Sequence, residues 1–194
     1  MIYIIRHGQT ELNNKRVLQG RSDYPLNTNG IAQAKEAARQ LRGIHFDRVL
    51  SSPLTRAIQT AEIVVPNITP NIEDCLIEMD YGPYEGMSLN APAPEVLAFF
   101  SDLVHNAAPD GMEPLASVVR RVGSLMEELI AHSHENILIS THAIAMKGIL
   151  EYLTPDSHGS YWSKYIGNCA VYVTECRKGT FAVPIPLEQY NGAS

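Results

Sequence analysis

The chain has 194 residues, of which 45% are hydrophobic and 19% charged, a balance typical of a soluble globular protein whose core is stable without disulfides. Fifteen Lys and Arg against 21 Asp and Glu give a formal net charge of −6, which argues against a general nucleic-acid binder and against binding to anionic membranes. Three widely spaced cysteines without a CxxC pair suggest neither a disulfide framework nor a thiolate zinc site, so we expect a cytoplasmic protein. No apolar run reaches the about 18 residues of a membrane span, and the short apolar start reads as a strand rather than a signal peptide.

Strands and helices alternate in the first third of the chain. The apolar run at 2–5 predicts a strand that is buried on both faces, as in a parallel sheet. Apolar residues at helical spacing then predict a helix that has Thr28 as its N-cap and ends before Gly43. A short strand is expected at 48–50, followed by a second helix for which Ser52 is the candidate N-cap.

The middle of the chain, 86–115, is its least regular part. Within it only 96–103 has a helical pattern, and we interpret the segment as a lid-like insertion that covers part of the fold. Beyond it, the pattern predicts a long amphipathic helix at 118–130, an apolar strand at 137–141 and a further helix at 143–153.

Two more strands are predicted in the C-terminal third, at 170–174 and 180–183. The tail, 184–194, loses its pattern and is expected to fray. Because strands and helices alternate without a repeat, a linker or a change in composition, we expect residues 1–194 to form a single α/β domain with a mostly parallel sheet.

Charged residues follow three of the predicted strands directly. Arg6 and His7 come after the first strand, Arg56 lies in the first turn of the helix after the second, and His142 follows the strand at 137–141. Open α/β sheets bind ligands beyond the carboxyl ends of their strands, so these four side chains are expected at one edge of the sheet. Two arginines and two histidines in an acidic chain indicate a pocket for a dianion such as a phosphomonoester.

Five motifs in order carry a family resemblance: RHG at 6–8, Asn13, SPLTRAIQTA at 52–61, LIEMDYGPYEG at 76–86 and STHA at 140–143. Together they resemble the histidine phosphatase superfamily, also called the phosphoglycerate mutase-like family. The resemblance covers residues 2 to about 153. It implies a three-layer α/β/α sandwich with a short helical insertion over the active site, and it implies the phosphatase branch of the family.

The resemblance also implies a role for each motif residue. His7 is expected to attack phosphorus and form a phosphohistidine that water then cleaves. Arg6, Arg56 and His142 match the family's charged clamp, and two nearby arginines should lower the pKa of His7 so that its attacking nitrogen is unprotonated. Glu78 matches the acid that protonates the leaving group.

Several weaker expectations complete the site. Asn13 matches the family's amide donor to the phosphate, and Glu11 and Glu85 are rival carboxylates to Glu78. Further contacts to substrate are expected from Gly8, Gln19, Gly20, Ala143 and Tyr81. Gly8 would let the backbone approach the phosphate. Ala143 stands where the family commonly has glycine, and its amide would still be available.

Two other functions stay open. A cofactor-dependent phosphoglycerate mutase would resemble this chain in its core, but the stretch 87–112 contains no Lys or Arg, which favours a phosphatase. The few charges there also suggest a substrate whose non-phosphate part is neutral or apolar. A non-catalytic module that binds phosphorylated ligands would need neither His7 nor Glu78. We expect no metal and no cofactor, a small phosphorylated substrate, and no nucleic acid or membrane partner; the oligomeric state is left open.

Overall fold

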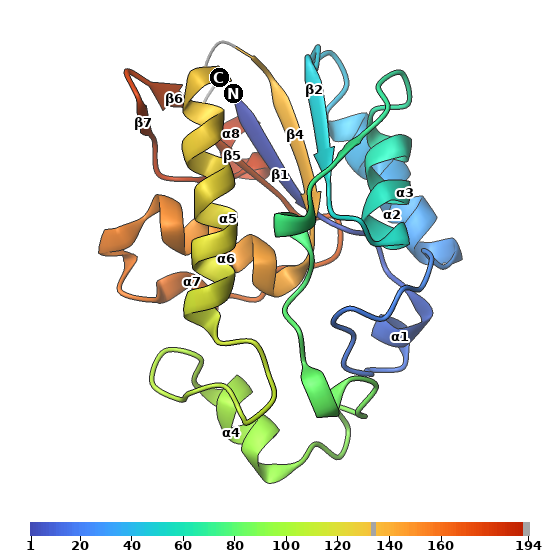
Figure 1. The fold of residues 1–194 in the computed structure, drawn as a ribbon. Coiled ribbons are helices and arrows are strands. Elements are labelled where there is room, and N and C mark those ends of the chain that lie inside the picture. Colours follow the sequence, from blue (N-terminus) through green and yellow to red (C-terminus); the bar gives the residue numbers. More distant parts are fainter. Residues whose placement is uncertain (133–134, 192–194) are drawn as a thin grey trace.

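A six-stranded sheet forms the centre of the computed structural model, which describes residues 1–132 and 135–191 (Figure 1). The strand order is β3-β2-β4-β1-β5-β8. The strands are β1 (Ile2–Arg6), β2 (Arg48–Ser51), β3 (Asn71–Ile72), β4 (Ile137–Thr141), β5 (Val171–Thr174) and β8 (Ile185–Pro186). β3, β2, β4 and β1 run parallel, whereas β5 is antiparallel to β1 and β8 is antiparallel to β5. The predicted α/β fold with a mostly parallel sheet is confirmed.

Helices cover both faces of this sheet and make three layers. α2 (Thr28–Gln40) and α3 (Thr55–Val64) lie on one face, and α5 (Leu115–Leu129) and α6 (Ala143–Leu153) on the other (Figure 1). Side chains of β1 alternate between the layers: Ile2 and Ile4 pack toward α5 and α6, while Tyr3 and Ile5 pack toward α2 and α3. This double burial explains the continuous apolar run at the start of the sequence.

Shorter elements complete the described chain. They are the helices α1 (Glu11–Asn14), α4 (Pro94–Ser101), α7 (Ser160–Ser163) and α8 (Leu187–Asn191), the strands β6 (Cys176–Arg177) and β7 (Thr180–Phe181), and 3-10 turns at Asp74–Leu76, Gly82–Tyr84, Ile130–His132 and Pro155–Ser157. The strand predicted at 180–183 is therefore shorter, and it pairs with β6 in a separate hairpin rather than with the central sheet. Lys178 and Gly179 turn this hairpin with φ values of 52° and 78°.

Both predicted helix caps differ from the structure. α2 begins at Thr28, but its N-cap is Asn27, whose side chain accepts a hydrogen bond from the Gly30 amide at 2.8 Å. Ser52 does not cap α3, which starts three residues later; its hydroxyl lies 2.6 Å from Nε2 of His142 instead. The sequence offers a good capping residue in each place, and tertiary contacts decide how it is used.

The segment 86–115 contains α4 and lies beyond the carboxyl ends of β1, β2 and β4 (Figure 1). α4 starts two residues before the predicted helix because Pro94 occupies its first turn, where no backbone N–H is needed. Val96, Phe99 and Met112 of this segment are buried against Met79 and Trp162. The segment therefore has a small hydrophobic core that joins it to the edge of the sheet.

The prediction that the tail frays is wrong for residues 184–191. Ile185 and Pro186 form β8, and Leu187 of α8 is buried in the layer that contains α2 and α3. Two paired residues are too few for a periodic pattern, and Pro186 is tolerated because β8 is an edge strand. Residues 192–194 of the tail lie outside the described residues.

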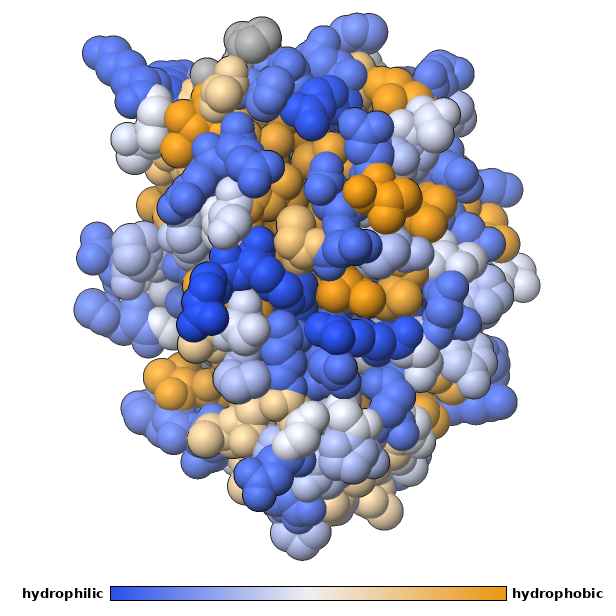
Figure 2. All heavy atoms as spheres, viewed as in Figure 1, coloured by the Kyte–Doolittle hydropathy of each residue, from blue (hydrophilic) through white to orange (hydrophobic). Residues whose placement is uncertain are grey.

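The surface in the view of Figure 2 carries hydrophobic residues in several separate groups among hydrophilic ones. No single apolar patch dominates this face. Within 1–132 and 135–191, no helix has both the length and the apolar character needed to cross a bilayer.

Candidate active site

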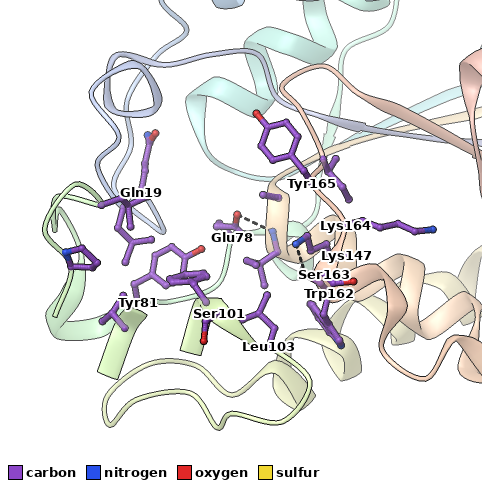
Figure 3. A pocket seen from close by; sticks show the side chains of 18 of the residues that line it. Gln19, Glu78, Tyr81, Ser101, Leu103, Lys147, Trp162, Ser163, Lys164 and Tyr165 are labelled. Atoms are coloured by element: carbon purple, nitrogen blue, oxygen red, sulfur yellow. Dashed lines mark hydrogen bonds between the residues drawn. The ribbon is translucent and has the colours of Figure 1, made fainter. Parts of the chain in front are cut away.

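A cavity of about 830 Å³ opens at the carboxyl ends of the parallel strands (Figure 3). Its floor contains the end of β1 and the start of α6, and its walls come from the insertion and from the segment around α7. The residues that line it include Arg6, His7, Asn13, Arg16, Gln19, Glu78, Tyr81, Phe100, Ala143, Ile144, Lys147, Trp162, Lys164 and Tyr165. The cavity is therefore the place where most of the predicted site residues meet.

His7 is held rigidly at the floor of the cavity and is only 3% exposed. Its Nδ1 lies 2.6 Å from the carbonyl oxygen of Gly8. A carbonyl only accepts hydrogen bonds, so Nδ1 carries the proton and Nε2 keeps a free lone pair. Burial first, and then the positive charges of Arg56 and Arg6, hold the pKa of His7 well below its usual value. The imidazole is thus neutral, with an unprotonated nitrogen.

Arg56 lies behind His7 and is fully buried. Its Nε donates to Nε2 of His7 at 3.3 Å, while Nη1 and Nη2 donate to the carbonyl oxygens of Ser22 and Gly20, each at 2.7 Å. Burial lowers the pKa of Arg56 to about 10, and the negative charge of Glu78 opposes this shift. The guanidinium is still cationic at neutral pH, and two backbone carbonyls fix its plane against the histidine.

Arg6 reaches the cavity from the end of β1. Its Nη1 donates to the carbonyl oxygen of Ile166 at 2.5 Å, and its Nε is buried without a hydrogen-bond partner among the described residues. Burial lowers the pKa of Arg6, with Glu78 acting in the opposite direction. One donor of this arginine therefore remains available to a ligand.

His142 stacks beside His7, with 5.1 Å between the ring centroids. It is fully buried, and burial, followed by the charge of Arg56, holds its pKa well below the usual value. Its Nε2 contacts the hydroxyl of Ser52, and its Nδ1 has no hydrogen-bond partner within the part of the chain that is described. A second buried polar atom next to His7 is thus unpaired in the described chain.

Glu78 is buried at the N-terminus of α6. Its Oε1 accepts from the amides of Met79 at 2.9 Å and Ala145 at 3.0 Å, and its Oε2 accepts from Ile144 at 3.2 Å. The carboxylate therefore closes the start of the helix, where free N–H groups favour negative charge. Met79 and Tyr81 are both buried nearby. Oε2, with its single bond, is the oxygen with more capacity for a ligand.

Asn13 and Gln19 also line the cavity. The Oδ1 of Asn13 accepts from the Thr10 amide at 3.1 Å, which leaves its NH₂ group for a ligand. The Oε1 of Gln19 accepts from the Thr10 hydroxyl at 2.6 Å, and its Nε2 is buried without a partner in the described chain. Thr10 thus orients both amides, a link that sequence reasoning did not anticipate.

Two of the residues expected to contact substrate, Gly8 and Gly20, do not line the cavity. Gly8 uses its amide to donate to Thr60 at 3.0 Å, and a Cβ on it would lie 2.5 Å from the carbonyl oxygen of Gly30. Gly20 donates to Glu85 at 2.9 Å and accepts from Arg56. Neither glycine lines the cavity: Gly8 allows the close approach of α2, and Gly20 supports Arg56. The remaining expected contacts, Ala143 and Tyr81, do line the cavity.

The two rival carboxylates are engaged elsewhere. Glu85 accepts from the amide of Ser22 at 3.2 Å and from its hydroxyl at 2.6 Å, in addition to the Gly20 amide. Glu11 is exposed and lies 3.5 Å from Lys15. Of these three candidates, Glu78 is therefore the one that lines the cavity.

Sequence reasoning missed three cations of the cavity: Arg16, Lys147 and Lys164. All lie outside 87–112, so the lack of Lys and Arg in that stretch does not make the cavity neutral. A signal for Lys147 was present, because it is the one cation among the apolar residues of α6. Aromatic side chains of Tyr81 and Tyr165 lie on two sides of the same space (Figure 3).

The described residues contain no group of three or more His, Cys, Asp or Glu side chains that could hold a metal ion. The groups gathered at this site are a neutral histidine, the fully buried Arg56, the half-buried Arg6, a second histidine and a carboxylate. Positive charge and unpaired donors surround an unprotonated nitrogen. Such a set can bind a phosphate group and attack it.

Comparisons with known proteins agree with this geometry. A model of the histidine phosphatase superfamily, branch 1, matches residues 2–185. A broad-specificity phosphatase of Saccharomyces cerevisiae is 33% identical over 170 residues, which cover 82% of this chain and 73% of that protein. A 2,3-bisphosphoglycerate-dependent phosphoglycerate mutase of a Methylobacterium species is 30% identical over 169 residues, or 79% of this chain and 80% of that protein.

A solved structure shares the fold over nearly its full length. Phosphoserine phosphatase from Entamoeba histolytica, in complex with 3-phosphoglyceric acid, superposes with a TM-score of 0.79 at 29% sequence identity, covering 95% of this chain and 93% of that one. The order of the motifs, the strand topology and the cluster around His7 all fit the same assignment. The chain belongs to the histidine phosphatase superfamily, branch 1.

Proposed function

We propose that this protein is a phosphomonoesterase that hydrolyses a small phosphorylated metabolite through a phosphohistidine on Nε2 of His7. The observation that carries the proposal is the 2.6 Å contact between Nδ1 of His7 and the Gly8 carbonyl, which leaves Nε2 unprotonated beside Arg56. The relatives include proteins named as phosphatases, among them one solved with 3-phosphoglyceric acid, and this supports a small phosphorylated substrate.

Three buried donors account for phosphate binding. Nε of Arg6, Nε2 of Gln19 and Nδ1 of His142 have no partner in the described chain, and all three lie around His7 or line its cavity. An unpaired buried donor costs roughly 1–3 kcal/mol, so three such atoms at one place favour a bound anion. The oxygens of a phosphoryl group would pair all three and would displace Arg56 Nε from the lone pair of His7. Asn13 would add its NH₂ group.

In the first step, the lone pair of His7 Nε2 forms a bond to phosphorus, and the bond between phosphorus and the ester oxygen breaks. The departing oxygen takes a proton from Glu78, which carries it on Oε2 when substrate is bound, and leaves as the alcohol. Arg6, Arg56 and His142 stabilise the charge on the three phosphoryl oxygens in the transition state. The product is phosphohistidine, and Glu78 is then a carboxylate.

In the second step, Glu78 takes a proton from water while the water oxygen bonds to phosphorus. The bond from phosphorus to Nε2 breaks, its electron pair returns to the imidazole, and inorganic phosphate leaves. Glu78 again holds the proton needed for the next turnover. The balance of atoms and charge is complete without a metal or cofactor, and we propose that the enzyme uses neither.

We further propose that residues 1–194 act as one domain in which 86–115 serves as a lid. This segment supplies Leu89, Val96 and Phe100 to the hydrophobic cluster that adjoins the cavity, so it can limit the access of water to the reacting groups. We also propose a cytoplasmic location, because the three cysteines are free thiols.

The test is turnover of p-nitrophenyl phosphate in excess EDTA by the wild type and by the variants His7→Ala and Glu78→Gln. We expect full activity with the chelator, no phosphoenzyme in His7→Ala, and a fall in kcat of about 100-fold or more in Glu78→Gln. Mass spectrometry after an alkaline quench, because phosphohistidine is hydrolysed in acid, would detect the phosphate on His7. Retained activity in His7→Ala, or inhibition by EDTA, would refute the mechanism.

A mutase remains the second candidate, because one relative is a phosphoglycerate mutase. An assay with 3-phosphoglycerate primed by 2,3-bisphosphoglycerate decides between them. Efficient formation of 2-phosphoglycerate would favour the mutase, whereas release of inorganic phosphate favours the phosphatase. A protein that binds vanadate but turns over no ester would be a non-catalytic binding module.

A further inference from the structure

Lys147 is a cation of the cavity wall that the proposed reaction does not use. It is the fifth residue of α6 and lies on the same helical face as Ala143 and Ile144. The amide of Ile144 donates to Glu78. Its Nζ donates to the carbonyl oxygen of Trp162 at 2.7 Å. In Figure 3 the Lys147 and Glu78 side chains face the same hollow, at its inner end.

The charge of Lys147 is poorly compensated. No carboxylate of the described residues lies within ion-pair distance of its Nζ, and the Trp162 carbonyl occupies one of its three hydrogens. Burial lowers its pKa to about 8, although the negative charge of Glu78 acts in the opposite direction. Placing an ammonium group here costs free energy, and a bound anion would recover part of that cost.

The position of Lys147 defines which part of a substrate it would meet. In the proposed reaction, Glu78 contacts the ester oxygen, while Arg6 and Gln19 hold the phosphoryl oxygens. Lys147 lies near Glu78, so it faces the alcohol part of the ester rather than the phosphoryl group. The other two cations are placed differently: Arg16 is exposed, and Nζ of Lys164 lies 4.1 Å from the ring centroid of Tyr161.

We propose that Lys147 forms a subsite for a carboxylate on the alcohol part of the substrate. The enzyme would then prefer phosphomonoesters of hydroxy acids and hydroxy amino acids over esters of the corresponding neutral alcohols. Two free hydrogens on one ammonium match the two oxygens of a single carboxylate. The proposal rests on the proposed function and adds a substrate class to it.

Matched substrates test the subsite. 3-Phosphoglycerate and glycerol 3-phosphate differ in one carboxylate, and so do phosphoserine and phosphoethanolamine. We expect the wild type to show at least a 10-fold higher kcat/KM for the carboxylate member of each pair, since a charge-assisted hydrogen bond contributes about that much. Lys147→Met should bring this kcat/KM ratio close to one, and Lys147→Arg should keep most of it. The control Lys35→Met, at an exposed position of α2 away from the cavity, should leave the ratio at the wild-type value.

The pH dependence of this kcat/KM ratio distinguishes carboxylate binding by Lys147 from a purely structural role of the same residue. The charged groups that face Lys147 are Glu78, Arg6 and, on its own helix, Glu151. As pH rises through about 8, Lys147 loses its proton, so the preference for carboxylates should fall, mainly through KM. A lysine that only ties α6 to Trp162 would change the melting temperature without changing this ratio.

The outcomes distinguish this inference from the function on which it rests. Turnover of p-nitrophenyl phosphate with a phosphohistidine, but equal kcat/KM within each pair, would overturn the subsite and leave the function intact. If Lys147→Met kept the wild-type ratio of kcat/KM within each substrate pair, that result would also overturn the subsite and leave the function intact. If that variant fails to fold, Lys147→Gln replaces it, with a circular dichroism melt as the check. No turnover of any ester would overturn both proposals.

Discussion

The hydroxyl oxygen of Ser52 lies 2.6 Å from Nε2 of His142. The same oxygen accepts from the Leu54 amide at 3.3 Å, so its proton is free to point at the imidazole. With Ser52 donating to Nε2, the ring proton of His142 is on Nδ1, the atom without a partner in the described chain. We expect Ser52 to hold this tautomer, in which His142 is a donor toward the site that we assign to the phosphate.

We expect Ser52→Ala to lower kcat/KM for p-nitrophenyl phosphate by about 10- to 100-fold, because His142 would no longer be held in the donor tautomer. Ser52→Thr keeps the hydroxyl and should recover most of the loss. Ser51→Ala is the matched control, since the Ser51 hydroxyl donates to the Ser52 carbonyl and not to His142. Equal activities in Ser51→Ala and Ser52→Ala would contradict this role.

Stability should fall in mild acid because two buried histidines have lowered pKa values. Below about pH 6.5 the unfolded chain binds protons at His7 and His142 that the folded chain does not bind. The free energy of unfolding is therefore highest above this pH and decreases below it, by up to about 2.7 kcal/mol per pH unit for the two groups. Urea titrations at several pH values measure how the free energy of unfolding changes with pH.

Replacing one histidine isolates its contribution to the pH dependence of the free energy of unfolding. In His142→Gln the slope should decrease by up to about 1.4 kcal/mol per pH unit, while the exposed His45→Gln should leave it as in the wild type. A slope unchanged by His142→Gln would mean that His142 is protonated in the folded protein, contrary to its surroundings.

Arg56→Lys should greatly reduce both activity and stability, although it conserves the positive charge. A lysine lacks the fork that bonds the carbonyls of Ser22 and Gly20 and the histidine at once. We expect kcat/KM to drop by about 100-fold or more and the free energy of unfolding by ~2–4 kcal/mol. The exposed Arg39→Lys serves as the control, and near-wild-type kinetics in Arg56→Lys would exclude the fork as the important feature.

Gly8→Ala should destabilise the protein without a specific effect on substrate binding. The new Cβ would lie 2.5 Å from the Gly30 carbonyl, so β1 and α2 would have to separate, at a cost of about 1–3 kcal/mol. In Gly167→Ala the new Cβ would lie 3.8 Å from Cε1 of Tyr165, an ordinary contact, and no such loss is expected. Thermal melts of Gly8→Ala and Gly167→Ala test the predicted loss of stability. A rise in KM with unchanged stability would instead support a contact between Gly8 and the phosphate.

Local sequence was sufficient for the elements with strong patterns. The strand at 137–141 and the helix at 143–153 were predicted with their observed bounds, because buried parallel strands are continuously apolar and α6 is apolar around Lys147. The order of strands and helices predicted the fold class. It also placed Arg6, His7, Arg56 and His142 at one edge of the sheet, since each follows a parallel strand.

Long-range contacts decided the rest. Whether Ser52 capped a helix or contacted His142, whether Gly8 faced a ligand or α2, and whether Ile185 joined the sheet all depended on residues far away in the chain. The amino-acid sequence by itself determined the chemical groups and the strand ends that carry them. Only the tertiary structure decided the tautomer of His7, the three unpaired donors and the position of Lys147, because each results from burial and from hydrogen-bond partners supplied by distant segments.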